Sequence, residues 1–441
     1  MASSRLLASL ATTKELADLF SDQSVLAALL RFESALSRAQ AQLGIVPASA
    51  ADAISRAGVA NDFNAEAIAR DARLCATIVI PLVKALTARV AAHDPIAARF
   101  VHWGATSQDA VDTAMSLLLS RAKPILARDH AHMAQSLRAL SEAHAKTVML
   151  GRTLLQPAPP ITFGYKVAGW YGGVQRSWRR LDTSFSDAVT LQFGGAAGTL
   201  AAYGQQGIAL AAALGKELNL PVANAPWHAH RDRMAALIAD CGIYTGALGK
   251  IARDVSLLMQ HEVGEVAEAG GRSSAMPHKR NPAGSVVALA AATRMPGLVA
   301  AFLAGMVQEH ERAAGGWQAE WPIVSDVIET TGSALAAIAG AIDGLTVYPD
   351  RMRANLGAAR GVIFAEKVRM LIQAAIGRET AENLLADAAR QALKTSRSFL
   401  EMLRTRPEVA SLLTAEQLDN IDCAEDYLGA AEEFRKNLLE G

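Results

Sequence analysis

Residues 270–285 gather more side chains suited to chemistry than the segments on either side of them. They read Gly-Gly-Arg-Ser-Ser-Ala-Met-Pro-His-Lys-Arg-Asn-Pro-Ala-Gly-Ser, and the reactive groups include two hydroxyls, an ammonium and an amide, on Ser273, Ser274, Lys279 and Asn281. The stretch contains no carboxylate. Hydroxyl, cation and amide groups together suit an anionic ligand, or a reaction in which negative charge builds on a carbon next to a carboxylate.

Composition alone leaves a second interpretation of this stretch open, which is a solvated basic connector between helices. A Walker-type phosphate loop is excluded, because the pattern Gly-x-x-x-x-Gly-Lys-Ser/Thr is absent. Gly194, Gly195 and Gly198 form another glycine-rich segment. No predicted strand precedes them, so they suit a tight connection with close backbone approach better than phosphate binding.

Long helices on both sides must hold residues 270–285 in place. Upstream, apolar residues recur in alternating steps of three and four, at Met234, Leu237, Cys241, Tyr244, Leu248, Ile251, Val255 and Leu258. This is the seam of a packed helix. A helix over about 232–268 would be a rod of roughly 50 Å, which requires partner helices. A second apolar run begins near Gly284, with a bend expected at Pro296.

The motif Ser-Ser-Ala-Met-Pro-His-Lys-Arg-Asn-Pro resembles the signature Ser-Ser-x-Met-Pro-x-Lys-x-Asn-Pro of the fumarase/aspartase superfamily. Four further segments look most like the 3-carboxy-cis,cis-muconate cycloisomerase family within it. These segments are residues 101–109, 191–198, 226–233 and 308–312. The resemblance runs from about residue 10 to beyond residue 430.

The resemblance implies addition to, or elimination from, a carbon next to a carboxylate, through an aci-carboxylate intermediate. In the cycloisomerases, which belong to protocatechuate breakdown (the beta-ketoadipate pathway), a substrate carboxylate adds across its own double bond and forms a carboxymuconolactone. By motif match, Ser273 is the catalytic base, and Lys279 and Asn281 stabilise the intermediate. The substrate-binding residues carried over are His102, Thr106, Ser107, Arg152, Thr153, Gln156, His228, Ser274, Met276 and Arg312.

The proline-rich segment 151–164 departs from the superfamily pattern, and we expect it to be largely non-helical. Many members have a histidine where this chain has Leu154, and the cycloisomerases have a tryptophan there and a histidine at the position of Pro157. The usual imidazole proton donor is therefore missing. Arg272 replaces a glycine, and Ser285 stands where many superfamily lyases carry a glutamate.

Charge and cysteine content bound the partners and the compartment. The 441 residues include 43 Lys plus Arg and 43 Asp plus Glu, so the protein has no net positive charge that would attract nucleic acid or an acidic membrane. Three widely separated cysteines predict free thiols and a reducing compartment. The N-terminus lacks the pattern of a secretion signal, and we expect no apolar run as long as a membrane span. A cytoplasmic location is predicted.

Abundant alanine and leucine, with 5% aromatic residues, predict an all-α protein. The resemblance implies an elongated fumarase/aspartase-like helical bundle. We expect an N-terminal helical domain over 1–110, a central long-helix bundle and oligomer core over 111–348, and a C-terminal helical domain over 349–441. The superfamily forms homotetramers in which each site is shared between subunits, and the resemblance implies this arrangement here.

The expected partner is a small di- or tricarboxylate, with no cofactor and no metal. His228 and His230 have no third ligand at suitable spacing. One alternative function is elimination from a substituted succinate, of the succinyl-amine or nitrosuccinate type. Another is a non-catalytic helical assembly protein, against which Ser273, Lys279 and Asn281 argue.

Overall fold

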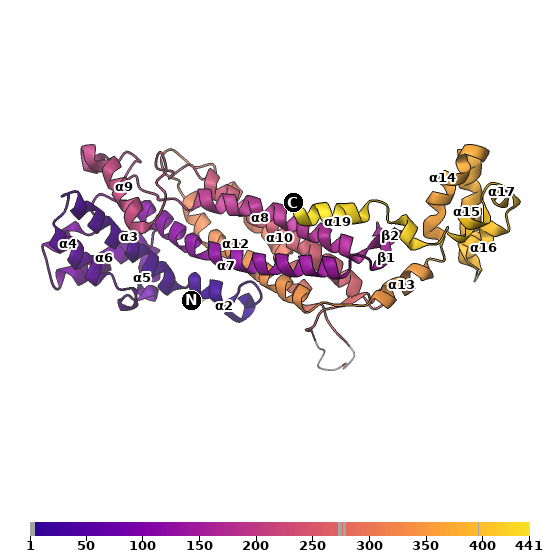
Figure 1. Ribbon diagram of the computed structural model, residues 1–441. Coiled ribbons are helices and arrows are strands. Elements are labelled where there is room, and N and C mark those ends of the chain that lie inside the picture. Colours follow the sequence, from indigo (N-terminus) through magenta and orange to yellow (C-terminus); the bar gives the residue numbers. More distant parts are fainter. Residues whose placement is uncertain (1–4, 272–275, 277–278, 396) are drawn as a thin grey trace. The chain divides into compact units, whose positions relative to one another are not determined.

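The computed structural model of the chain describes residues 5–271, 276, 279–395 and 397–441 (Figure 1). Helices make up most of it, and the strands of this described part form two short two-stranded sheets. The predicted all-α class is confirmed. The chain divides into two compact units, one of residues 1–131, 176–249 and 287–337, the other of residues 132–175, 250–286 and 338–441. The three-domain division stays a prediction.

The first unit begins with the short helices α1 (Arg5–Ala8) and α2 (Lys14–Leu19). A group of helices that lie together follows (indigo in Figure 1): α3 (Asp22–Gln42), α4 (Ala48–Ala57), α5 (Ala65–Ala72) and α6 (Val79–Ala91), with the 3-10 turns η1 (Ala60–Asp62) and η2 (Ala97–Phe100). Later in the chain the unit adds η3 (Ala201–Gln206) and α9 (Gly207–Leu218), which packs against α3.

Five long helices contribute residues to both units: α7 (Ser107–Ala143), α8 (Phe163–Ala188), α10 (Asp232–Met259), α11 (Ala283–Ala304) and α12 (Gly316–Asp343). The predicted seam of α10 is confirmed, since the eight seam residues predicted between Met234 and Leu258 are at most 4% exposed. The helix is shorter than predicted. It ends at Met259, because a turn through Gly264, with φ of 61°, leads into β3 (Val266–Ala267), which pairs with β4 (Thr346–Val347).

Three of these helices, α10, α11 and α12, are long and apolar enough to cross a membrane by length and composition alone. This corrects the expectation that no apolar segment reaches that length. In α10 and α12, 56% and 61% of the most apolar window is buried inside the protein, against 22% in α11. The first two are therefore core helices, whereas the described part of the chain leaves most of the apolar window of α11 uncovered.

The second unit holds a β-hairpin in the segment that the sequence predicted to be largely non-helical, and that prediction is confirmed. Strands β1 (Val148–Thr153) and β2 (Gln156–Thr162) pair antiparallel, with Thr153 opposite Gln156. The prolines of β2 are compatible with a strand, because β2 pairs on one side only. Gly151 permits the close approach of the strands, since a Cβ there would lie 2.2 Å from the carbonyl oxygen of Pro159.

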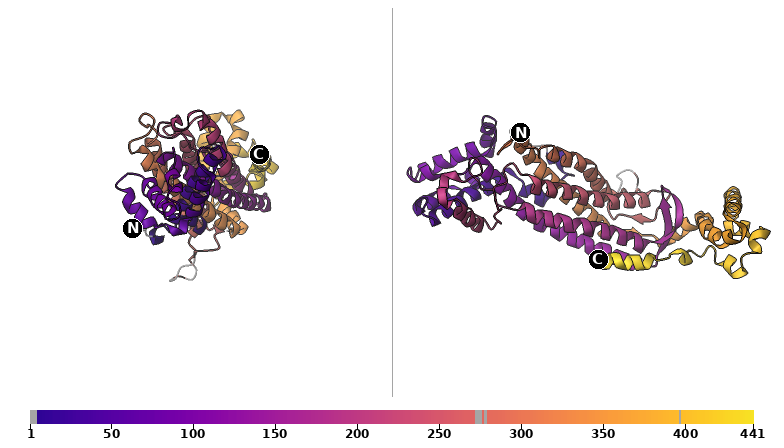
Figure 2. Two further views of the ribbon diagram at one scale, coloured as in Figure 1. Left: turned by 90° about the vertical axis from the view of Figure 1, so that its left-hand side faces the viewer. Right: turned by 90° about the horizontal axis from the view of Figure 1, so that it is seen from above.

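Most of the C-terminal helices of this unit pack around a core of their own. They are α13 (Pro349–Ala358), α14 (Ala365–Ile376), α15 (Arg378–Lys394), α16 (Phe399–Arg404), α17 (Pro407–Ala410) and α18 (Ala415–Asp419), with η4 (Val362–Phe364) and η5 (Ala424–Tyr427). The helix α19 (Ala431–Glu440) contributes none of the described residues of this core. Phe364, Val368 and Phe399 are central to this core, and Val148 and Leu150 join it from β1. Seen from above, α14 to α17 (orange to yellow) again cluster together (Figure 2).

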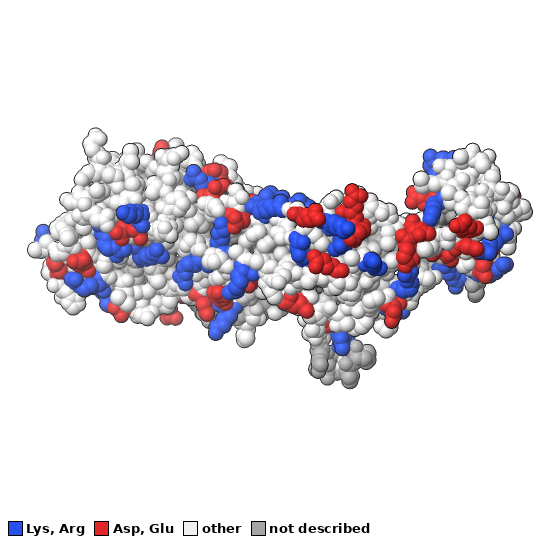
Figure 3. All heavy atoms as spheres, in the orientation of Figure 1, with Lys and Arg blue, Asp and Glu red and all other residues white. Residues whose placement is uncertain are grey.

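Charged side chains of both signs are intermixed over the face shown in Figure 3. This distribution agrees with the formal net charge of zero. Any anion-binding site must therefore be built locally, from a few side chains and backbone groups.

Candidate active site

The loop before α7 is organised by the fully buried carboxylate of Asp109, in the first turn of that helix. Its Oδ1 accepts from the N–H of Gly194 at 2.9 Å and lies 2.7 Å from Nε2 of His228. Its Oδ2 accepts from the N–H groups of Thr106, at 3.1 Å, and Gly195, at 2.9 Å. Three backbone donors and an imidazole thus compensate a charge that would otherwise be unfavourable to bury.

The glycines of this cluster confirm the predicted close backbone approach. A Cβ on Gly194 would lie 2.7 Å from Cβ of Pro226 and 2.8 Å from Cε1 of His228. Gly195 has φ of 70°, a left-handed conformation that glycine adopts without strain. The predicted substrate-binding residue His228 is 3% exposed. Its imidazole is buried against Asp109.

Two predicted substrate-binding residues, Thr106 and Arg312, are in direct contact. Nη1 of Arg312 donates to Oγ1 of Thr106 at 2.8 Å, and Nη2 donates to the carbonyl oxygens of Gly195 and Ala196 at 3.3 and 3.0 Å. Because Oγ1 accepts from Arg312, the hydroxyl hydrogen of Thr106 is left to point at another acceptor. Ser107 is the first residue of α7, where unsatisfied N–H groups favour an anion.

His102 lies in the same loop and is held by Glu33, with Nδ1 2.7 Å from Oε1 of the carboxylate. Burial lowers the pKa of His102, but the charges of Glu33 and Asp109 and the hydrogen bond to Glu33 raise it, and the net pKa lies above its ordinary value. The next carbonyl, of Trp103, accepts from Nε2 of Gln40 at 2.7 Å and from the hydroxyl of Tyr203 at 2.6 Å. The loop is thereby fixed beside the imidazole.

A buried charge cluster centred on Arg231 stabilises the start of α7, close to the loop that precedes it. Arg231 pairs with Asp112 at 2.8 Å and with Glu320 at 2.6 Å, and all three side chains are at most 4% exposed. Burial and the charge of Asp112 raise the pKa of Glu320, while Arg231 opposes that rise. The indole N–H of Trp317 also donates to Asp112, at 3.0 Å. The cluster ties the start of α10 to α7 and α12.

The predicted residues Arg152, Thr153 and Gln156 lie on the hairpin of the second unit. Nη1 and Nη2 of Arg152 donate to the carboxylate of Glu265 at 3.0 and 2.7 Å. Glu265 is completely buried and also accepts from Asn355 at 2.8 Å. Two donors of Arg152 are therefore engaged inside the unit, while Thr153 and Gln156 are exposed at the turn.

The turn of the hairpin is made of two leucines. Leu154 and Leu155 have φ of 49° and 65° and are 96% and 75% exposed. Two-residue turns of this kind favour Asn-Gly, because both positions need positive φ. Leu154, at the position where many superfamily members carry a histidine, thus lies in a strained, exposed, apolar turn. Pro157, close to this turn, is also exposed.

Ser273 and Ser274, the predicted base and its neighbour, lie outside the described residues. Of the other predicted residues in this segment, Met276 is 43% exposed and Lys279 is exposed. The backbone N–H of Asn281 donates to the carbonyl of Gly271 at 2.8 Å. A Cβ on Gly271 would lie 2.0 Å from the carbonyl oxygen of Asn281, so this closure requires glycine.

Glu268 fixes the downstream side of this segment at the start of α11. Its carboxylate accepts from the N–H groups of Gly284 and Ser285, at 2.8 and 3.1 Å, and from the hydroxyl of Ser285 at 2.6 Å. Glu268 and Ser285 are both buried. The serine that stands where many superfamily lyases carry a glutamate therefore helps to cap a helix.

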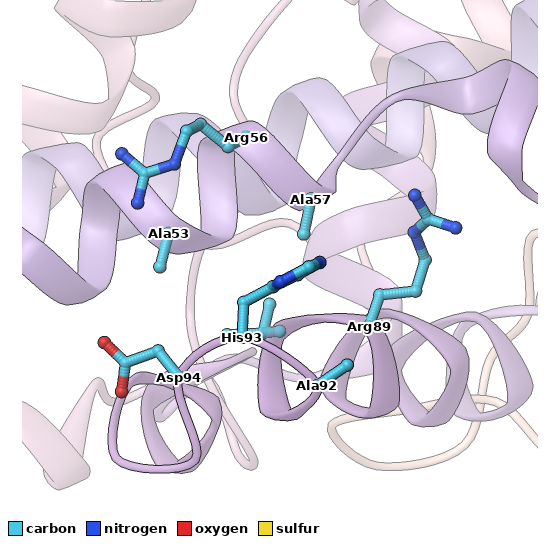
Figure 4. A pocket seen from close by; sticks show the side chains of 8 residues that line it. Ala53, Arg56, Ala57, Arg89, Ala92, His93 and Asp94 are labelled. Atoms are coloured by element: carbon cyan, nitrogen blue, oxygen red, sulfur yellow. The ribbon is translucent and has the colours of Figure 1, made fainter.

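A cavity of about 600 Å³ lies in the first unit between α4 and the end of α6 (Figure 4). Arg56 lines it from α4, and Arg89 and His93 line it from α6 and the turn that follows. Arg89 is paired with Asp62 at 2.5 Å. None of the predicted site residues that the structure describes lines this cavity, so it is separate from the loop before α7.

Sequence patterns did not single out Glu33, Glu265 or Glu268, and Asp109 was noted only as the end of a motif. A signal was present for Glu33, which occupies the apolar face of α3 three residues before Leu36 and four after Leu29. A charged residue at such a position must have a partner. The partners of the other three carboxylates come from distant segments, which periodicity does not reveal.

Two protein-family models match separate parts of the chain. The model of a family described as Lyase matches residues 10–297, and the model described as adenylosuccinate lyase C-terminus matches residues 361–438.

Individual relatives match over nearly the whole chain. A 3-carboxy-cis,cis-muconate cycloisomerase of Bradyrhizobium diazoefficiens is 44% identical over 95% of this chain and 94% of that protein. A nitrosuccinate lyase of Streptomyces davaonensis is 42% identical over 93% of this chain and 89% of that protein. The crystal structure of the 3-carboxy-cis,cis-muconate lactonizing enzyme from Pseudomonas putida superposes with a TM-score of 0.93 at 39% identity, covering 99% of this chain and 98% of that one.

Proposed function

The chain belongs to the lyase family of the fumarase/aspartase superfamily, and from that premise we propose that it is a 3-carboxy-cis,cis-muconate cycloisomerase. The observation that carries the proposal is its similarity to such enzymes along almost the entire chain, in sequence and in fold. The reaction converts an open-chain tricarboxylate to a lactone, and its place is in protocatechuate breakdown.

The loop before α7 supplies groups suited to the carboxylates of this substrate. Thr106 has a hydroxyl hydrogen free of Arg312, Ser107 stands at the N-terminus of α7, and His102 carries a raised pKa. A helix N-terminus, a hydroxyl and an imidazolium all favour a bound carboxylate. Asp109 does not repel it strongly, because its own charge is compensated by backbone N–H groups.

In the proposed reaction, an oxygen of one substrate carboxylate forms a bond to a carbon of its own conjugated double bond. The electron pair of that double bond moves toward the adjacent carboxylate and gives the aci-carboxylate intermediate. Lys279 and Asn281 are the groups proposed to stabilise this charge. Ser273, the superfamily base, returns a proton to the carbon as its hydroxyl, and the resulting alkoxide is reprotonated from water.

The departures at Leu154 and Pro157 are compatible with this chemistry. The intramolecular addition of a carboxylate to a double bond releases no leaving group, so no second acid is needed to protonate one. An elimination lyase does release a leaving group. The cycloisomerase reaction can therefore proceed without an acid at the exposed apolar tip of Leu154 and Leu155.

We propose further that the enzyme is a homotetramer with sites shared between subunits, and that it works in the cytoplasm. The largely uncovered apolar window of α11 supports association with other copies, because a large exposed apolar surface marks an interface. Val286 and Leu303 on that helix are 54% and 42% exposed. The three free cysteines are in keeping with a reducing compartment.

Product analysis tests the proposed function. Purified protein is incubated with 3-carboxy-cis,cis-muconate, and the product is followed by proton NMR. We expect the olefinic signals of the diene to be replaced by those of a carboxymuconolactone. The same protein is incubated in parallel with nitrosuccinate. Fumarate release from nitrosuccinate, with no lactone formed from the diene, would overturn the proposal.

A further inference from the structure

Glu33 is a buried carboxylate whose position is not explained by packing. Its side chain is 2% exposed, and Oε1 lies 2.7 Å from Nδ1 of His102, whose side chain is 16% exposed. Its Oε2 is buried and has no hydrogen-bond partner within the described part of the chain. On α3 it lies among the fully buried Leu29, Leu30 and Leu36. A charge in such surroundings is stable only if its partner carries the opposite charge.

His102 is the partner that meets this requirement. Its backbone has φ of 56°, a left-handed conformation that is unfavourable for a residue with a side chain. The loop keeps this conformation because Glu33 holds the ring and because Gln40 and Tyr203 hold the next carbonyl. Since Nδ1 is taken by Glu33, the ring has Nε2 as its second donor.

The charged and titratable groups around the imidazole favour its protonated form. Glu33 faces it from α3, and Asp109 acts on it from α7. Asp109 is itself bonded to His228 from the segment before α10. Burial raises the pKa of Tyr203, in η3, and the charges of Asp109 and Glu33 raise it further. Arg312 contributes a cation to the same loop, where it donates to Thr106 and two backbone carbonyls.

We infer that Glu33 is a positioning residue that holds His102 as an imidazolium, so that Nε2–H of this ring binds a carboxylate of the substrate. The inference rests on the proposed function for the identity of the substrate. An ordinary histidine is mostly neutral above pH 6.5. The buried carboxylate therefore favours the cationic form of the imidazole, and it also fixes which ring nitrogen faces the ligand.

The first measurement is an NMR titration of the histidine side chains in the full-length protein labelled with ¹⁵N-histidine. The signal of His102 is assigned by its loss in His102→Gln. We expect wild-type His102 to titrate above pH 6.5 and to titrate at lower pH in Glu33→Gln. Asp343→Asn is the matched control, because His132 lies 2.5 Å from Asp343 in a pair whose side chains are 57% and 37% exposed. That variant should leave the His102 titration unchanged.

The second measurement is the pH dependence of kcat and KM for 3-carboxy-cis,cis-muconate. A fall of one pKa unit changes the ratio of charged to neutral imidazole about tenfold, so we expect KM of Glu33→Gln at pH 7.5 to rise by up to about tenfold. A binding role leaves kcat within about threefold. Circular dichroism and size-exclusion chromatography establish that the variant is folded.

Each outcome decides the inference. Wild-type titration of His102 at or below pH 6.5 overturns it without any variant. It is also overturned if kcat of Glu33→Gln falls while KM holds, because that result assigns the pair to proton transfer. A protein that shows the expected titration but does not turn over this substrate contradicts the proposed function and supports the charge pair, so the two failures are distinguishable.

Discussion

Replacing Asp109 with asparagine tests the buried network under the loop before α7. Asparagine keeps the shape of the side chain but exchanges one acceptor oxygen for an NH₂ donor. In the best orientation the remaining oxygen still accepts from the N–H groups of Thr106 and Gly195. The new NH₂ then faces the N–H of Gly194, and His228 must change from donor to acceptor.

The expected destabilisation follows from these contacts. One buried N–H loses its acceptor, which is unfavourable by about 1–3 kcal/mol, and the loss of charge weakens each of the other bonds by roughly 1 kcal/mol. One lost acceptor and three weakened bonds together give about 4–6 kcal/mol. With a urea dependence of about 3 kcal/mol per molar, the unfolding midpoint should fall by about 1 M or more.

The assay is urea unfolding followed by far-UV circular dichroism. The matched control is Asp343→Asn, because the side chain of Asp343 is 37% exposed. This variant should change the unfolding midpoint by less than about 0.3 M. The reasoning is refuted if the two variants shift the midpoint equally. That result would mean that the bonds to Asp109 contribute no more than a surface pair.

Three further outcomes are expected. Leu154→Asn with Leu155→Gly should stabilise the hairpin by about 1–2 kcal/mol in thermal unfolding, because both positions have positive φ; an unchanged melting temperature would contradict the strain. The pair of His102 and Glu33 should stabilise the fold fully below pH 6.5 and lose that contribution as the pH rises through the raised pKa of His102. The urea midpoints of wild type and His102→Gln should therefore differ more at pH 6 than at pH 9, and an equal difference at both would speak against the pair. Val286→Glu on α11 should yield smaller species in sedimentation velocity, and an unaltered sedimentation coefficient would exclude this face from the assembly.

The sequence predicts the helical scaffold well because apolar periodicity reports burial directly. The seam from Met234 to Leu258 is buried as the spacing of three and four requires. The end of the same helix at Met259 was missed by nine residues, because no proline or strong turn pair precedes Gly270. The hairpin was missed for a related reason, since Leu154 and Leu155 adopt a turn that normally carries Asn-Gly.

The candidate site was predictable only in part. Motif resemblance named Thr106 and Arg312, which the structure brings into contact across 206 positions of sequence. The carboxylates that support the site could not be derived in this way. Asp109 finds its partners 85, 86 and 119 positions away, and such pairings depend on tertiary packing rather than on local pattern.

Loss of the conjugated-diene absorbance of 3-carboxy-cis,cis-muconate tests the central claim most directly. Purified wild-type protein and Ser273→Ala are compared at equal concentration, after size-exclusion chromatography has shown the same assembly for both. We predict rapid loss with the wild type and a rate at least about a thousandfold lower with the variant, as expected for removal of the group that transfers the proton. No loss with correctly assembled wild type, or equal rates for both proteins, would contradict the account.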